Sequence, residues 1–180
     1  SWPRRFVRLA PATTTSPTTT PLQPAATTLL VAWSALQLLM PLRGWLYDGN
    51  VRWHEQGMRF SWRVMVREKN GTVTFHLEDK ATGRRWFVRP RQWLDARQDR
   101  EFSTQPDLIL QLAKHIAAEE RARGRDVAVR AEALVSLNGR PAALLVDPTV
   151  DLATVDDGVS PASWITAAPT SPPASLPPRR

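Results

Sequence analysis

An uncharged, apolar segment runs from Ala25 to Leu42 and stops at an arginine followed by two aromatic residues. Its length is near the lower bound for a bilayer span, which takes about 17 to 25 residues. Pro41 lacks the N–H that a helix interior needs, so it should end the helix. We therefore expect a helix over residues 27–42, within an apolar membrane segment over 25–46. A buried core helix and a signal-type segment are the alternatives.

Further along the chain, apolar residues recur at every second position, the pattern of strands with one buried face. Phe60–Arg67 alternates in this way. Asn70-Gly71 follows, and both residues tolerate positive φ, so it predicts a hairpin turn. A return strand over 72–78, a turn at Thr82-Gly83 and a strand over 84–89 complete a predicted three-stranded meander. The apolar faces that should meet and become buried in its first hairpin carry Phe60, Trp62, Val73 and Phe75.

The second half of the sequence predicts one helix and one further hairpin. An apolar stripe of period 3.6 indicates an amphipathic helix near 106–122. Residues 127–137 alternate again, and Asn138-Gly139 is a second hairpin signal before a short return strand. Together these elements predict an α+β domain over 47–157, with an antiparallel sheet of about five strands and one packed helix. It is preceded by the apolar helix and flanked by disordered tails.

Both ends of the chain have compositions that do not favour a packed core. Residues 1–24 are rich in Thr and Pro, and 158–180 are rich in Pro. Segments of this kind bury too little apolar surface to offset the entropy of ordering, so we expect both to be disordered. The chain begins at Ser1, so we expect a fragment or a processed product.

The chain carries a net charge of +7, and arginine supplies almost all of the positive charge. A basic excess suits a nucleic acid or an anionic membrane surface. Cysteine is absent, which excludes a disulfide framework and a thiolate site. The histidines, His54, His76 and His115, do not pair at metal-ligand spacing, so no metal site is predicted.

Two short patterns carry a family resemblance. The first is a proline-arginine step, a Trp, an acidic residue, a Gly and an aromatic-Ser-Trp stretch, here Pro41, Arg43, Trp53, Glu55, Gly57, Phe60, Ser61 and Trp62. The second reads V-S-L-N followed by D-P-T-V-D, at Val135–Asn138 and Asp147–Asp151. In this order they resemble the C-terminal, lumenal-type region of the vitamin K-dependent γ-carboxylases and their bacterial relatives, the HTTM-domain proteins. The resemblance covers roughly residues 28–157 and makes 25–46 the family's last membrane helix.

The resemblance implies a carbon–carbon lyase reaction. A lysine in the membrane part deprotonates vitamin K hydroquinone, oxygenation gives a strong base, and the glutamate carbanion takes up carbon dioxide. That lysine would lie N-terminal to this chain, whose own lysines, Lys69, Lys80 and Lys114, lie outside any apolar helix. We therefore expect no catalytic residue and no bound cofactor in this chain. The expected substrate-binding residues, around the aromatic-Ser-Trp stretch, are Trp53, Glu55, Arg59, Phe60, Ser61 and Trp62.

The resulting hypothesis is the extramembrane part of a membrane protein that presents the substrate side for glutamate carboxylation. The expected partners are a glutamate-containing peptide or protein, the remaining membrane helices of the same protein and the bilayer, with Arg43, Trp45 and Tyr47 at the headgroups. One alternative is a non-catalytic, membrane-associated interaction module. A weaker alternative is a basic nucleic-acid-binding domain, in which aromatic residues of Arg84–Trp93 stack on bases while arginines hold phosphates.

Overall fold

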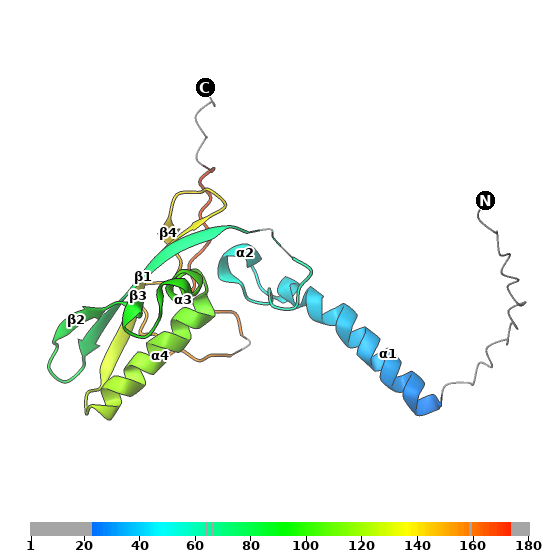
Figure 1. The fold of residues 1–180 in the computed structure, drawn as a ribbon, viewed down its shortest axis with the longest axis horizontal. Coiled ribbons are helices and arrows are strands. Elements are labelled where there is room, and N and C mark those ends of the chain that lie inside the picture. Colours follow the sequence, from blue (N-terminus) through cyan, green and yellow to red (C-terminus); the bar gives the residue numbers. More distant parts are fainter. Residues whose placement is uncertain (1–22, 64, 66, 159, 174–180) are drawn as a thin grey trace, which may run out of the picture. The chain divides into compact units, whose positions relative to one another are not determined.

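The computed structural model describes residues 23–63, 65, 67–158 and 160–173 (Figure 1). The chain divides into two units, Ser1–Leu36 and Gln37–Arg180. The described residues of the first unit belong mainly to helix α1. In chain order the elements are α1 (Pro24–Leu39), η1 (Met40–Leu46), α2 (Val51–His54), β1 (Lys69–Asp79), β2 (Arg85–Val88), η2 (Pro90–Gln92), α3 (Ala96–Phe102), α4 (Pro106–Ala122), β3 (Val127–Leu137) and β4 (Ala143–Leu144).

The predicted helix over 27–42 is confirmed. Helix α1 runs directly into the 3-10 helix η1. The α-helical part ends at Leu39, just before Pro41, as expected from the missing N–H of proline. No residue of α1 is buried. The stretch Pro24–Leu46 is long and apolar enough to cross a membrane by length and composition.

Four antiparallel strands form one sheet in the order β2-β1-β3-β4. The two long central strands pair along their whole length, from Lys69 opposite Leu137 to Asp79 opposite Val127. Both hairpin turns used in this sheet were predicted from glycine, which adopts positive φ freely. Gly83 has φ +69 between β1 and β2, and Gly139 has φ +74 between β3 and β4. The predicted α+β class with an antiparallel sheet is confirmed, with four strands.

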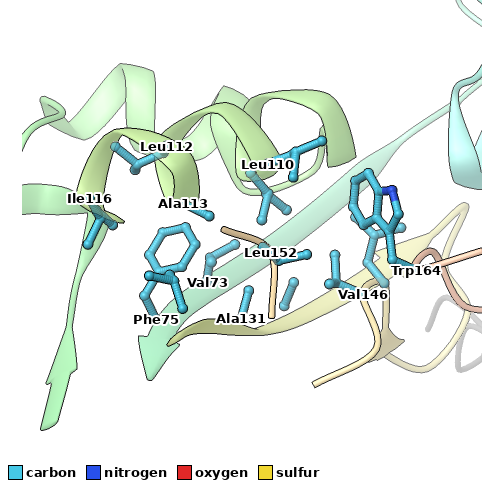
Figure 2. Packing of buried hydrophobic residues seen from close by; sticks show 14 of the residues in the cluster. Val73, Phe75, Leu110, Leu112, Ala113, Ile116, Ala131, Val146, Leu152 and Trp164 are labelled. Atoms are coloured by element: carbon cyan, nitrogen blue, oxygen red, sulfur yellow. The ribbon is translucent and has the colours of Figure 1, made fainter. Parts of the chain in front are cut away.

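Helix α4 covers one face of the sheet and forms the core with it. Figure 2 shows the side chains of this cluster lying between the helix and the strands. Phe75 from β1 and Ala131 from β3 are opposite each other in the sheet, and both are completely buried. The helix contributes Ile109, Leu110, Leu112, Ala113, Ile116 and Ala117. The predicted helix near 106–122 and strand over 127–137 are therefore confirmed.

The predicted first strand, Phe60–Arg67, is wrong. Its described residues lie in turns and bends, and Phe60 and Met65 have φ of 60° and 54°, which no strand residue adopts. Val64 and Val66 lie outside the described residues. The side chain of Phe60 is 74 % exposed and that of Trp62 is 69 % exposed, so their predicted burial is also wrong.

The predicted turn at Asn70-Gly71 is also wrong. Strand β3 is long enough to pair with both residues, so β1 continues straight through them. At Gly71 a Cβ atom would lie 2.8 Å from Cγ2 of Val135 and 3.0 Å from the carbonyl oxygen of Leu134. Glycine is therefore needed here for close approach of the two strands, a role that the hairpin pattern does not distinguish from a turn.

The segment after β4 returns to the core. Val146 forms an antiparallel bridge with Ile165, and Leu152 and Trp164 are buried (Figure 2). Residues 161–166 are thus part of the folded unit, where the proline content predicted a disordered tail. Their few apolar side chains are enough to order this segment, because they pack against the edge of a core that the sheet and α4 already form. The predicted disorder of 1–22 and 174–180 falls outside the described residues.

Candidate functional site

The candidate site is built around the short helix α2 and the turn that follows it. The Asn50 side chain caps this helix by accepting from the backbone N–H of Arg52 at 3.0 Å. The helix ends at Glu55, which adopts the left-handed conformation with φ 61°. Gly57, which has φ +70, then packs closely on Gly44. A Cβ atom added at Gly57 would lie only 2.7 Å from the Cα of Gly44. These contacts join the segment after α1 to the segment around residue 58.

Trp53 is directed into the core from α2. Its Nε1–H donates to the carbonyl oxygen of Thr166 at 2.9 Å, and only 1 % of the residue is exposed. Lys69 lies 5.6 Å from the centre of its ring, a cation–π geometry. The ring therefore joins α2, β1 and the C-terminal segment, and it has no surface left for a ligand.

Glu55 is the centre of a partly buried ion cluster. Its Oε1 accepts from Nζ of Lys69 at 2.8 Å and also pairs with Arg67. The Lys69 side chain is only 3 % exposed, and Nζ donates further to the carbonyl oxygens of Trp53 (2.6 Å) and Thr104 (3.1 Å). Burial lowers the pKa of Lys69, while the Glu55 carboxylate acts in the opposite direction. Lys69 lies outside any apolar helix, as the sequence indicated, but burial in the fold lowers its pKa nonetheless.

His54 is buried beside this cluster. Its Nδ1 accepts from the backbone N–H of Gln56 at 3.1 Å, so the neutral ring carries its proton on Nε2. Nε2 has no hydrogen-bond partner among the described residues. Burial lowers the pKa of His54, and the nearby positive charge of Lys69 lowers it further. The ring is therefore neutral at pH 7.

A groove of about 1150 Å³ opens beside these residues, with one wall from residues 43–67, another from the start of α4 and a third from residues 150–165. Its cationic lining residues are Arg43, Arg59, Arg63 and Arg67, and its acidic ones are Glu55, Asp107, Asp156 and Asp157. Apolar walls come from Met58, Met65, Pro106, Leu110, Val150, Val155, Pro161, Trp164 and Ile165. Cationic, apolar and backbone groups thus converge on one hollow, as in peptide and ligand sites.

The arginines of the groove differ in how they are paired. Arg59 forms an ion pair with Asp107 across the groove. Nη2 of Arg43 donates to the carbonyl oxygen of Arg59 at 2.7 Å, and its guanidinium lies 5.7 Å from the ring centre of Phe60. Arg67 pairs with Glu55. Arg63 is exposed and pairs with no acidic side chain in the part of the chain that the structure describes.

The structure separates the six predicted substrate-binding residues. Glu55 and Arg59 line the groove, and Trp53 lies in the core. Phe60 and Trp62 are exposed outside the groove, and Oγ of Ser61 is buried without a partner among the described residues. Sequence reasoning missed the residues that complete the groove, Arg43, His54, Arg67, Asp107 and the 150–165 wall. The sequence signal for Arg43, His54 and Arg67 was that they are polar and lie near the aromatic-Ser-Trp stretch. The C-terminal wall gave no such signal, because it is distant from that stretch in sequence.

The aspartates of the second motif, D-P-T-V-D, stabilise the turn after β4. Asp147 accepts from the N–H and the hydroxyl of Thr149, at 2.8 and 2.6 Å, and these bonds lower its pKa. Asp151 accepts from the N–H of Val129 in β3 at 2.9 Å. These carboxylates hold the turn after β4. No group of three or more His, Cys, Asp or Glu side chains among the described residues could hold a metal ion.

The arginine-tryptophan stretch Arg84–Trp93 is largely committed to the fold. Trp86 packs on the core, and the guanidinium groups of Arg84 and Arg125 each lie 5.9 Å from its ring centre. Trp93 donates from Nε1 to Glu119 at 3.1 Å. Of the three aromatic residues, Phe87 alone is exposed. The rings of Trp86 and Trp93 are therefore not presented for stacking on bases.

Comparison with known proteins gives one match. The family model described as vitamin K-dependent gamma-carboxylase, lumenal domain, matches residues 22–171. No curated protein and no solved structure is significantly similar to the chain. The match spans the apolar helix, the groove and the sheet, so both the short motifs and the α+β domain lie within it. With the apolar helix it indicates a membrane-associated protein. The chain belongs to the family of the vitamin K-dependent gamma-carboxylase lumenal domain.

Proposed function

We propose that this chain supplies the substrate-facing surface of a gamma-carboxylase-type membrane protein, and that the groove holds a glutamate-containing segment of another protein. The observation that carries the proposal is the groove of about 1150 Å³, in which arginines and apolar side chains face the same space. A peptidyl glutamate has a carboxylate for the arginines and a chain for the apolar walls.

Arg59 is the arginine that this proposal assigns to the carboxylate first. Its side chain is 63 % exposed and is held at the groove by Asp107, so an incoming carboxylate meets an oriented guanidinium. Arg63 lines the same wall without an acidic partner among the described residues and adds positive charge there. Arginine suits this role because its planar donors match a carboxylate.

The described residues do not fit the vitamin K hydroquinone that the family implies. Deprotonating a hydroquinone requires an accessible base, and Lys69 is the lysine whose pKa burial lowers. All three donors of its ammonium group are engaged, by Trp53, Glu55 and Thr104. The proposal therefore leaves the quinone and the proton-abstracting base outside this chain.

The test is binding of a fluorescent peptide with a central glutamate to the full chain in detergent, against the same peptide with glutamine. We expect the glutamate peptide to bind more tightly and Arg59→Ala to weaken it about tenfold, the worth of one charge-assisted hydrogen bond. Asp107→Asn should strengthen binding, because it removes the carboxylate that competes for Arg59 while the amide oxygen can still orient the guanidinium group. Arg97→Ala, at an exposed arginine outside the groove, is the matched control. Equal affinity for both peptides would refute carboxylate recognition and favour a general interaction module.

A further inference from the structure

The two edges of the sheet differ in how their backbone groups are used. On the β4 side, the N–H of Val129 in β3 donates to Asp151 at 2.9 Å, and its carbonyl oxygen accepts from Leu152 at 2.8 Å. The carbonyl oxygen of Ala133 accepts from Leu145 at 2.8 Å. At the other side, β2 is the last strand, and no described element pairs with it beyond β1 (Figure 1). An unpaired edge of this kind is a template for a further strand.

The unpaired backbone groups of this edge can be located. In an antiparallel pair, residues that bond to the neighbouring strand alternate with residues whose N–H and C=O groups point away from it. The N–H of Asp79 donates to the carbonyl oxygen of Arg84 at 2.9 Å, so in the observed register Trp86 also bonds to β1. Arg85 and Phe87 alternate with these positions. Their N–H and C=O groups therefore point to the open edge, where no described residue forms a hydrogen bond with them.

The side chains of these edge residues lie on the face of the sheet away from α4. Trp86 and Val88 pack on the core, so the alternation of a strand places Arg85 and Phe87 on the opposite face. Phe87 is 63 % exposed, and Arg89 continues the extended backbone with φ −103° and ψ 145°. A hollow of about 640 Å³ borders Arg85 and Phe87. Both the backbone edge and its outward side chains are thus accessible to a partner.

The charge of the edge selects the partner. Arg84–Trp93 contains four arginines and no acidic residue. Arg84 and Arg89 pair with no acidic side chain in the described part of the chain, whereas Arg85 pairs with Glu78 at 3.2 Å. Two copies of β2 that paired antiparallel around the central phenylalanine would place Arg85 opposite Arg89. Like charges directly opposite each other are destabilising, so the edge disfavours a second copy and complements an acidic strand.

We propose that β2 is a docking edge for an extended acidic segment of a partner protein, which adds to the sheet as an antiparallel strand. Acidic residues of that segment lie opposite Arg85 and Arg89, and an apolar residue between them packs on Phe87. The antiparallel orientation continues that of every strand pair in the sheet. The proposal does not depend on glutamate binding in the groove, because none of these residues lines it.

The probe is a fluorescent peptide with glutamate, valine and glutamate at alternating positions and threonine between them. A second peptide keeps every side chain but carries a methyl group on the valine nitrogen, which would face β2. Binding is measured on the full chain in detergent with Arg59→Ala, so that carboxylate binding in the groove is already weakened. We expect the methylated peptide to bind about tenfold more weakly, since it loses a backbone hydrogen bond and introduces a clash. Equal affinity would overturn the proposal, because attraction between side chains alone needs no strand pairing.

A charge exchange tests the position of the added strand. Arg89→Glu should weaken the unmethylated peptide about tenfold. Lysine in place of the first glutamate of the peptide should restore binding to this variant, because the antiparallel orientation places that residue opposite position 89. Arg97→Ala, at an exposed arginine outside β2 and the groove, is the control and should change neither affinity. A charge exchange without any recovery would overturn the proposed pairing.

Two substitutions at one position separate the backbone from the side chain. Phe87→Ala and Phe87→Pro both remove the ring, but proline also removes the N–H at the open edge and leaves the bonds to β1 in place. We expect the proline variant to bind the peptide about fivefold more weakly than the alanine variant. Equal binding by the two folded variants would refute strand addition. Self-association of the chain that Phe87→Pro abolishes and the peptide does not disrupt would assign the edge to a second copy and overturn the proposal as well.

Discussion

Replacing Glu55 with glutamine removes the negative charge from the most buried ion cluster among the described residues while keeping the shape of the side chain. Nζ of Lys69 lies 2.8 Å from the Glu55 carboxylate. At an effective dielectric constant of about 20, that distance corresponds to roughly 6 kcal/mol of attraction. The carbonyl oxygens of Trp53 and Thr104 and the glutamine oxygen would still solvate Lys69 in part.

Breaking a buried pair from one side typically costs about 3 to 5 kcal/mol, since the remaining charge is left buried. The Glu55 side chain is 12 % exposed and its second partner, Arg67, is 31 % exposed, so water recovers some of this cost. We therefore expect Glu55→Gln to lower the free energy of unfolding by about 2 to 4 kcal/mol.

Urea unfolding of the full chain in detergent, followed by tryptophan fluorescence, measures this change. The control is the same substitution in a Lys69→Met background, where the stranded ammonium group no longer exists. There we expect a loss below about 1 kcal/mol, from Arg67 alone. Equal losses in both backgrounds would show that Glu55 does not act through Lys69, and the structural account of this cluster would be refuted.

Three further changes test other parts of the structure. Gly57→Ala should destabilise by about 2 to 4 kcal/mol, because the residue has φ +70 and its Cβ would lie 2.7 Å from Gly44; a loss under about 0.5 kcal/mol in the same urea assay would contradict that contact. Trp62→Ala should change stability by less than about 0.5 kcal/mol, since the side chain is exposed; a cavity-sized loss would show that it is buried after all. Burial lowers the pKa of His54 below its usual 6.5, so the unfolded chain takes up a proton at higher pH than the folded one and stability falls as pH drops through about 6.5. His54→Asn keeps an acceptor for Gln56 and should flatten this pH dependence of urea unfolding; an unchanged slope would assign it to another group.

The site was predictable from the sequence only in part. The aromatic-Ser-Trp stretch directed attention to the correct region, and Glu55 and Arg59 do line the groove. The chemistry around Glu55 was not predictable, because Lys69 becomes buried only when β1 pairs with β3. The far wall of the groove could not be predicted either, since it comes from residues 150–165 and depends on the packing of Trp164.

The sequence alone determined the elements whose signals are local. The uncharged segment before Pro41, the amphipathic period of α4, the alternation of β3 and the turn at Asn138-Gly139 each follow from the chemistry of neighbouring residues. Tertiary structure decided everything that required a choice of partner. Alternation at Phe60–Arg67 suited a strand equally well, but β1 runs straight through Asn70-Gly71 opposite β3, so no turn brings the chain back against Phe60–Arg67. Phe60 and Met65 are left exposed with positive φ. Strand pairing is a competition between distant segments for one set of backbone hydrogen bonds, and periodicity within a single segment does not determine which competitor wins.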